Sequence, residues 1–335
     1  MEAKTWKSGV TMGVATLLGA FIAFAGMPAV FKKVPTDLER TRVLISAVRA
    51  IQSGSLESPD IVLLGNSVTM NGVDADLVAS RMASKPKIYN FSSTGQSVAE
   101  SFLYFQELPA KTKQVVLVVP TRNLETDGLP PKDVANAFYM NGYRVKPSTQ
   151  SVLNSVFSDQ AAMLQRNDVE QRFASRWVLS QVVDTVVRKK LRKDMETSKS
   201  ILSLSYPAPY SKKIGSAEFE KLLPSYESKR EPGPFKPLDQ QVVMIRKMGE
   251  QLAGSGAKLW VVFAPLNPRR FDALGSKYVE SVTTFSQLSP FGPDAKILDL
   301  TSLLGADDFI DVVHPTRAGA EKISARIGEF LERGF

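Results

Sequence analysis

The pattern of apolar positions predicts short buried strands that alternate with amphipathic helices. Five apolar runs are short and nearly continuous, which is typical of strands buried on both faces of a parallel sheet. The alternation of these runs with helical patterns predicts an α/β fold with an open five-stranded parallel sheet. The predicted strands are Ile61–Leu64, Lys87–Phe91, Val115–Val119, Lys258–Phe263 and Lys296–Leu300.

Helical spacing of apolar residues fills the segments between these runs. A helix is expected at Leu38–Gln52 before the first strand, and two more at Gly72–Met82 and Ser97–Leu108. Another is expected from Leu238 to Gly254, where Val242, Ile245, Gly249 and Leu252 share one face. The last helix has an apolar stripe at Ile323, Ile327, Phe330 and Leu331.

One connection is too long for a loop. Well over a hundred residues separate Val119 from Lys258, and a structureless loop of that length is not credible in a compact domain. We therefore expect residues 124–237 to form a cap-like insert over the carboxyl edge of the sheet, within an α/β domain at 59–335. Val178–Leu191 is expected to be helical, and Ser205–Pro237 is expected to be irregular.

The N-terminal segment Val10–Phe31 carries no charged residue and is long enough to cross a bilayer of about 30 Å. An uncleaved signal anchor and a cleavable signal peptide, cut near Ala23–Ala25, are both compatible with it. We favour an anchor at 1–33 followed by a linker at 34–58, because the apolar run continues to Phe31. Lys and Arg residues flank both ends, and their count does not favour export of the C-terminal domain.

Composition excludes several classes of chemistry. The chain has no cysteine and a single histidine, which excludes disulfides, thiolate zinc sites, cysteine nucleophiles and multi-histidine metal sites. The net charge of +8 could favour nucleic acid, anionic lipid or anionic polysaccharide. No nucleic-acid-binding motif is present, so no nucleic-acid partner is expected, and no metal or organic cofactor is predicted.

Polar residues follow the predicted strands, where open α/β sheets bind their ligands. Ser67 comes directly after the first strand, and Asp311 and His314 come after the last. A serine hydroxyl becomes a nucleophile only when a base takes its proton, and His314 is the only imidazole available. Asp311 is near enough in sequence to orient that imidazole. The N–H groups of Ser67 and Gly95, with a side-chain amide, could form an oxyanion hole.

These motifs, "LLGNSVT" and "DVVHP", resemble those of the SGNH/GDSL hydrolase superfamily. The resemblance implies a sheet of the flavodoxin-like kind. It also implies a catalytic triad of Ser67, His314 and Asp311, with Gly95 and Asn123 in the oxyanion hole. Asn66 replaces the aspartate of the Gly-Asp-Ser motif, and we assign it no catalytic role. The third motif, "PTRN", departs from the family pattern and shifts Asn123 by one position. The side-chain oxyanion donor could therefore be Asn123, Arg122 or Asn267.

The apolar N-terminus, the long insert and the "FAPLNP" strand end resemble a membrane-anchored branch of this superfamily. Its members include teichoic-acid D-alanylation and alginate O-acetylation proteins, which act in cell-envelope acylation. The resemblance implies an O-acyltransferase that takes an envelope polysaccharide or an acylated carrier as substrate. It also implies a single-pass protein of the cytoplasmic membrane, with its catalytic domain on the periplasmic side and a membrane-bound O-acyltransferase as partner. An esterase or deacetylase of an envelope glycan or lipid, and a non-catalytic scaffold, are the alternatives.

Overall fold

The computed structural model describes residues 39–109, 111–126, 128, 143, 145–157, 203–206, 213–227, 232–275 and 277–334. The anchor predicted at Val10–Phe31 and the helix predicted at Val178–Leu191 lie outside these residues. Among the residues described, no helix is both long and apolar enough to cross a membrane.

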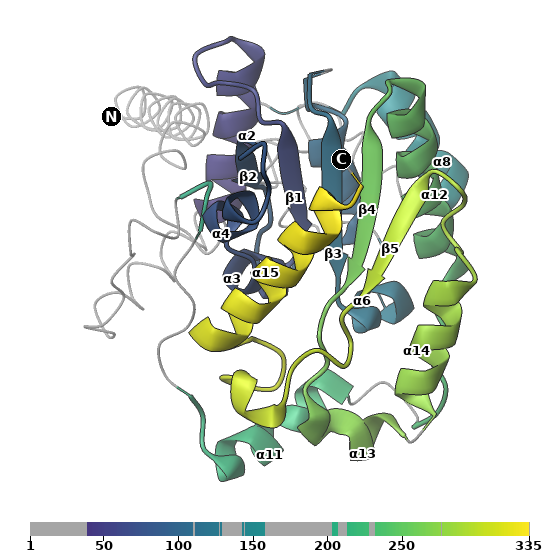
Figure 1. Cartoon of the computed structure of the whole chain (residues 1–335). Helices are drawn as coiled ribbons and strands as arrows, with labels where there is room; N and C mark the ends of the chain where they lie inside the picture. The colour runs from purple at the N-terminus through teal and green to yellow at the C-terminus, as the bar shows by residue number, and fades with distance from the viewer. Residues whose placement is uncertain are drawn as a thin grey trace, which may run out of the picture.

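A five-stranded parallel sheet forms the centre of the molecule (Figure 1). Its strand order is β2-β1-β3-β4-β5, and every neighbouring pair is parallel. This confirms the predicted α/β fold class, and each predicted strand agrees with the structure to within one residue at either end. The strands are β1 (Ile61–Gly65), β2 (Ile88–Asn90), β3 (Gln114–Val119), β4 (Lys258–Phe263) and β5 (Ala295–Asp299).

Helices cover both faces of the sheet (Figure 1), so each strand is buried on both sides. Val62 and Leu64 of β1 belong to one apolar cluster, and Ile61 and Leu63 belong to the other. The first cluster lies under α2 (Glu39–Gln52), α5 (Val98–Phe105), α8 (Pro147–Phe157), α12 (Asp239–Gly254) and α14 (Tyr278–Gln287). The second lies under α3 (Ser67–Gly72), α4 (Ala75–Ser80) and α15 (Arg317–Glu332).

The helix predicted at Gly72–Met82 corresponds to α4, which is shorter at both ends, and a second short helix, α3, precedes it and was not predicted. Asn66 caps α3 by accepting a hydrogen bond from the Val68 N–H at 2.9 Å. Asp74 starts α4 by accepting hydrogen bonds from two N–H groups of its first turn. Side-chain caps of this kind set helix starts, and the spacing of apolar residues does not reveal them.

The long connection between β3 and β4 contains α6 (Thr121–Thr126), α8, α11 (Ser216–Glu227) and α12. The expectation that Ser205–Pro237 is irregular is wrong for α11, which is helical although it contains Pro224. Phe219 of this helix is buried, and the Arg269 guanidinium lies 3.6 Å from the centre of its ring. Burial of one aromatic ring therefore stabilises a helix that the local composition does not indicate.

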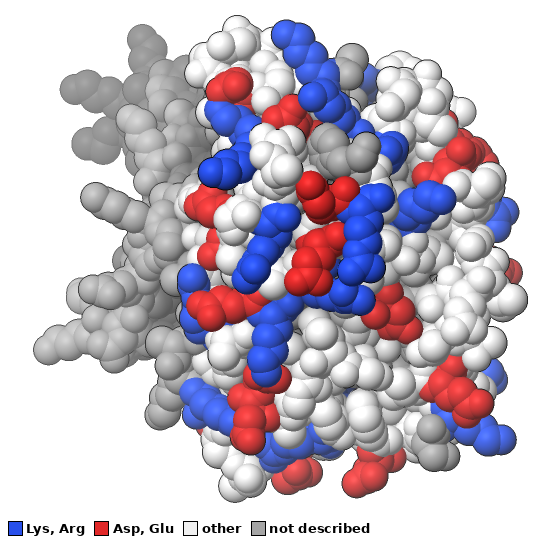
Figure 2. Space-filling view, viewed as in Figure 1, with Lys and Arg blue, Asp and Glu red and all other residues white. Residues whose placement is uncertain are grey.

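Charge is mixed on the face that carries α15 (Figure 2), where acidic and basic side chains alternate. Lys322 pairs with Asp308 at 2.8 Å, and Arg317 pairs with Glu321 at 2.9 Å. The net charge of +8 therefore does not gather into a positive patch on this face.

Candidate active site

The site lies where the order of the strands reverses. The chain passes from β1 outward to β2 and then returns to pair β3 with the other side of β1. In open parallel sheets the crevice at such a point, at the carboxyl ends of the strands, is the usual binding place. Ser67 directly follows β1 as the first residue of α3, and Asn123 lies in α6 directly after β3.

Ser67, His314 and Asp311 form one hydrogen-bonded chain. The Nε2 atom of His314 lies 2.9 Å from the Oγ atom of Ser67, although the two residues are 247 positions apart. The other ring nitrogen, Nδ1, lies 2.8 Å from Oδ2 of Asp311. His314 is only 7% exposed, so the ring is held between its two partners. The structure thus brings the three predicted residues together in the geometry of a Ser-His-Asp triad.

The Asp311 carboxylate is fixed by its own turn. Its Oδ1 atom accepts hydrogen bonds from the N–H groups of Val313 and His314, at 2.9 and 2.8 Å. Burial acts to raise the pKa of Asp311, but hydrogen bonds from the His314 ring and from these N–H groups outweigh it. The pKa therefore lies below its usual value. The carboxylate stays ionised at neutral pH and can stabilise a protonated His314.

Asn267 supports this turn from the loop after β4. Its Nδ2 atom donates to the backbone oxygen of Asp311 at 3.0 Å, and its Oδ1 atom accepts from the Arg269 N–H. The Asn267 amide thus holds the backbone of the triad acid, which favours Asn123 over Asn267 as the side-chain oxyanion donor.

Two backbone N–H groups are available for an oxyanion. Ser67 is the first residue of α3, where an N–H has no acceptor inside the helix. Gly95 lies in the exposed loop after β2 with a φ of +68°, and no described residue accepts a hydrogen bond from its N–H. The same loop is joined to the end of β1, because the Ser93 N–H donates to the Gly65 oxygen at 3.2 Å.

Asn123 is the candidate side-chain donor that lies beside the serine. Its Oδ1 atom accepts a hydrogen bond from Asn66 Nδ2 at 3.2 Å, and its Nδ2 atom donates to the Gln96 oxygen at 3.4 Å. The amide therefore bridges the start of α3 and the loop that carries Gly95. Arg122, the third candidate, lines a different cavity in the fold.

Asn66 has a part in the site that the sequence analysis missed. It touches no reacting atom, but it caps α3 and orients the amide of Asn123. Asparagine is a favoured N-cap residue, so the capping role could have been inferred from its place before Ser67. The contact with Asn123 joins residues 57 positions apart, and no local signal predicts it.

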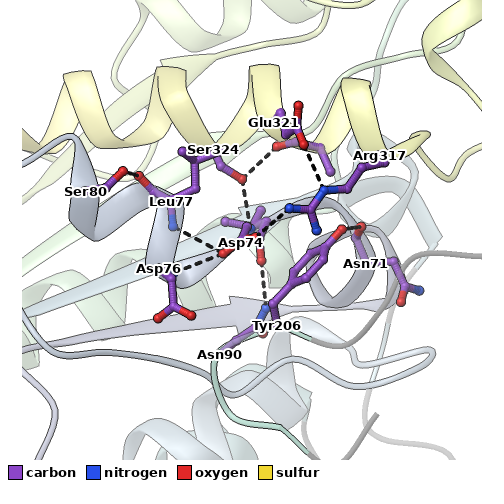
Figure 3. Close-up of polar contacts among 12 residues, drawn as sticks. Asn71, Asp74, Asp76, Leu77, Ser80, Asn90, Tyr206, Arg317, Glu321 and Ser324 are labelled. Carbon is purple, nitrogen blue, oxygen red and sulfur yellow. Dashed lines mark hydrogen bonds and ion pairs between the residues drawn. The ribbon is translucent and has the colours of Figure 1, made fainter. Parts of the chain in front are cut away.

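A short piece of the insert, 203–206, lies at the edge of the sheet beside β2, where the Asn90 N–H donates to the Leu204 oxygen. Its last residue, Tyr206, lies beside Asp74 and Arg317 (Figure 3). The Ser205 oxygen accepts a hydrogen bond from the Ala75 N–H at 3.3 Å. The Arg317 guanidinium lies 4.9 Å from the centre of the Tyr206 ring and 3.5 Å from an Asp74 carboxylate oxygen. Arg317 is three residues beyond His314, so this part of the insert is tied to the start of α15, beside the triad.

Within the described ranges, no group of three or more His, Asp or Glu side chains could hold a metal ion.

Comparison with models of known protein families gives no match, and none of the curated proteins matches the chain. Among solved structures, a candidate acylhydrolase from Bacteroides fragilis aligns with a TM-score of 0.37 and 13% sequence identity. The alignment covers 85% of this chain and 94% of that chain. At this level of similarity it carries no argument, so function has to be argued from the residues of the site.

Proposed function

We propose that the protein is a serine-dependent acyl-transfer enzyme whose nucleophile is Ser67. The observation that supports this most is the chain from Ser67 Oγ through both ring nitrogens of His314 to Asp311, with contacts of 2.9 and 2.8 Å. Helix capping alone would not account for a serine hydroxyl at one ring nitrogen and a carboxylate at the other. This arrangement prepares the hydroxyl for deprotonation.

In the first half-reaction, His314 Nε2 takes the proton of Ser67 while Oγ attacks the carbonyl carbon of an acyl ester or thioester. The negative charge that develops on the carbonyl oxygen is stabilised by the N–H groups of Ser67 and Gly95 and by the Asn123 amide. His314 then gives its proton to the leaving oxygen or sulfur. The carbon–leaving-group bond breaks, and an acyl-serine forms at Ser67.

In the second half-reaction, His314 takes a proton from an acceptor hydroxyl, which attacks the acyl-serine. Collapse of the tetrahedral intermediate breaks the bond to Ser67 Oγ, and His314 returns the proton to that oxygen. Asp311 holds the imidazole in one tautomer and stabilises its charge throughout. A sugar hydroxyl as acceptor makes the protein a transferase, and water makes it an esterase.

We propose that the acceptor is a polysaccharide of the cell envelope or an exported one, and that the group transferred is acetyl or a similar acyl group. The support for this is the resemblance of the sequence motifs to the membrane-anchored acylation proteins, together with the uncharged segment Val10–Phe31. On this proposal the segment anchors the enzyme to the cytoplasmic membrane. The catalytic domain then faces the periplasm, beside a membrane-bound O-acyltransferase.

Transfer and hydrolysis can be separated by product analysis. The full chain is incubated with p-nitrophenyl acetate, with and without an oligosaccharide acceptor, and the acetylated sugar and free acetate are measured by mass spectrometry. We expect acetylated sugar to form at the expense of acetate. We also expect Ser67→Ala to lower turnover by at least about a thousandfold. Ser80→Ala, which removes an exposed hydroxyl bound to the Leu77 oxygen, serves as the matched control and is expected to keep full activity.

Acetate as the sole product at every acceptor concentration would favour an esterase. Unchanged envelope acylation in cells that carry Ser67→Ala would instead show that the protein acts as a scaffold.

A further inference from the structure

A cavity of about 360 Å³ lies between α6, α11 and α13 (Phe271–Leu274). We call it the α6–α11 cavity. Its size suits a single small unit of a ligand, such as one sugar residue. The charged and aromatic side chains that line it include Arg122, Glu125, Tyr226, Glu227, Lys236 and Arg270.

Two walls of this cavity continue from segments of the candidate active site. Arg122 precedes Asn123 in α6, and Asn123 is bonded to Asn66 beside the nucleophile. On the other wall, Arg270 follows three residues after Asn267, which holds the backbone of Asp311. The cavity and the triad therefore share the carboxyl edge of the sheet, as α6 and α13 do in Figure 1.

The two carboxylates of the cavity are already engaged. Glu227 Oε1 accepts from Arg270 Nε and Nη2 at 2.8 and 2.5 Å. Glu125 accepts from the Tyr278 hydroxyl and from the Lys236 backbone N–H, both at 3.0 Å. The positive charge of Arg270 is thus balanced within the wall, and neither acid is directed at an incoming ligand.

Two other cationic side chains, those of Arg122 and Lys236, line the cavity. Among the described residues, neither the Arg122 guanidinium nor the Lys236 ammonium group has a carboxylate within ion-pair distance. Arg122 is half-buried and Lys236 is exposed, so Arg122 is the less accessible to solvent of the two residues. A guanidinium matches the geometry of a carboxylate or phosphate with two parallel hydrogen bonds, and partial burial strengthens such a contact.

We infer that the α6–α11 cavity binds an anionic group, a carboxylate or a phosphate, carried on a sugar unit of the acyl acceptor. Arg122 is the principal ligand of the anion, and Lys236 adds a second positive charge at the exposed rim. The Tyr226 ring, Pro232 and Pro234 supply apolar surface for the body of the sugar. The inference rests on the proposed function only in identifying the bound molecule as the acceptor, because anion binding itself needs no catalysis.

Direct binding measurements on the full chain test this. The probes are glucose, glucuronate and glucose 6-phosphate, which share one ring and differ in charge. Titration calorimetry is carried out on the wild type and on Ser67→Ala, in which binding can be followed without turnover. We expect glucuronate or glucose 6-phosphate to bind both proteins and glucose to bind neither, and the tighter of the two anionic sugars identifies the anion.

Substitutions then locate the site. Arg122→Gln is expected to weaken binding of the anionic sugar by about tenfold or more, since it removes a charged hydrogen-bond pair. Lys236→Gln is expected to have a smaller effect. Arg333→Gln, an exposed arginine at the end of α15, is the matched control and should bind as the wild type does. Thermal unfolding checks that each variant folds. Arg122→Lys keeps the positive charge but cannot make two parallel hydrogen bonds, so it should bind the anionic sugar with intermediate affinity.

Equal binding of glucose and the anionic sugars would overturn the inference, as would equal affinities in Arg122→Gln and Arg333→Gln. The binding results test the inference separately from the proposed function. If acyl-serine formed in a wild type that bound no anion, the inference alone would fail. If Arg122-dependent binding were found without any acyl-serine, the proposed function alone would fail.

Discussion

The Asp311→Asn variant is expected to lose about three to four orders of magnitude in kcat toward an aryl acetate at neutral pH. The reason lies in the two different tasks of the carboxylate oxygens. Oδ1 accepts hydrogen bonds from two backbone N–H groups, so the side-chain oxygen of the asparagine in the variant is expected to take that position. The new NH₂ group then faces His314 Nδ1, where Oδ2 now lies at 2.8 Å.

An NH₂ group at that place donates to Nδ1 and leaves the ring proton on Nε2. That nitrogen then has no lone pair with which to take the proton of Ser67, although the geometry of the site is nearly unchanged. Steady-state kinetics of purified wild type and variant give the measurement. Asp308→Asn is the matched control, because this neighbouring carboxylate pairs with Lys322 at 2.8 Å and not with the imidazole. If Asp311→Asn kept a tenth or more of wild-type kcat, Asp311 would not orient His314.

The Gly65→Ala variant is expected to lose about 3–5 kcal/mol of unfolding free energy, or to fail to fold. Gly65 ends β1 with a φ of +149°, a backbone conformation that L side chains rarely adopt. A Cβ atom there would lie 2.1 Å from Thr69 Oγ1 and 2.5 Å from the Val118 oxygen. Neither neighbour can move away, because Thr69 is fully buried in α3 and Val118 is paired with Gly65 in the sheet.

Urea unfolding followed by circular dichroism measures this loss. Gly54→Ala is the matched control, since Gly54 also has a positive φ, +75°, but an added Cβ would meet nothing within 4 Å. The control is expected to lose only about 1–2 kcal/mol, the cost of the left-handed conformation alone. Equal losses in the two variants would mean that the junction between β1 and α3 is not the tight turn that directs Ser67 toward His314.

The sequence was sufficient to predict the strands because both faces of this sheet are buried. Continuous apolar runs such as Val115–Val119 then stand out from the amphipathic helices around them. The apolar pattern alone does not give the order of the strands, because pairing between β1 and β3 joins segments about fifty residues apart in the chain. The helix at Ser216–Glu227 was also missed, since the contact of Phe219 with Arg269 that stabilises it is distant in sequence.

The same division applies to the site. Ser67, Asp311 and His314 could be predicted because a chain with one histidine offers few alternatives, and because the strand ends locate the edge where they meet. The choice among Arg122, Asn123 and Asn267 could not be made from sequence. It depends on which loop each amide or guanidinium faces, and only the folded structure shows Asn123 bonded to Asn66 and Asn267 bonded to Asp311.

Covalent labelling is the most direct test of whether Ser67 is an activated nucleophile. The full chain is treated with a fluorophosphonate, whose phosphorus is attacked by an activated serine with loss of fluoride, and the adduct is located by peptide mass spectrometry. We expect one adduct, on Ser67, in the wild type and none in Ser67→Ala. An unlabelled wild type, or equal labelling of the two proteins, would contradict this expectation.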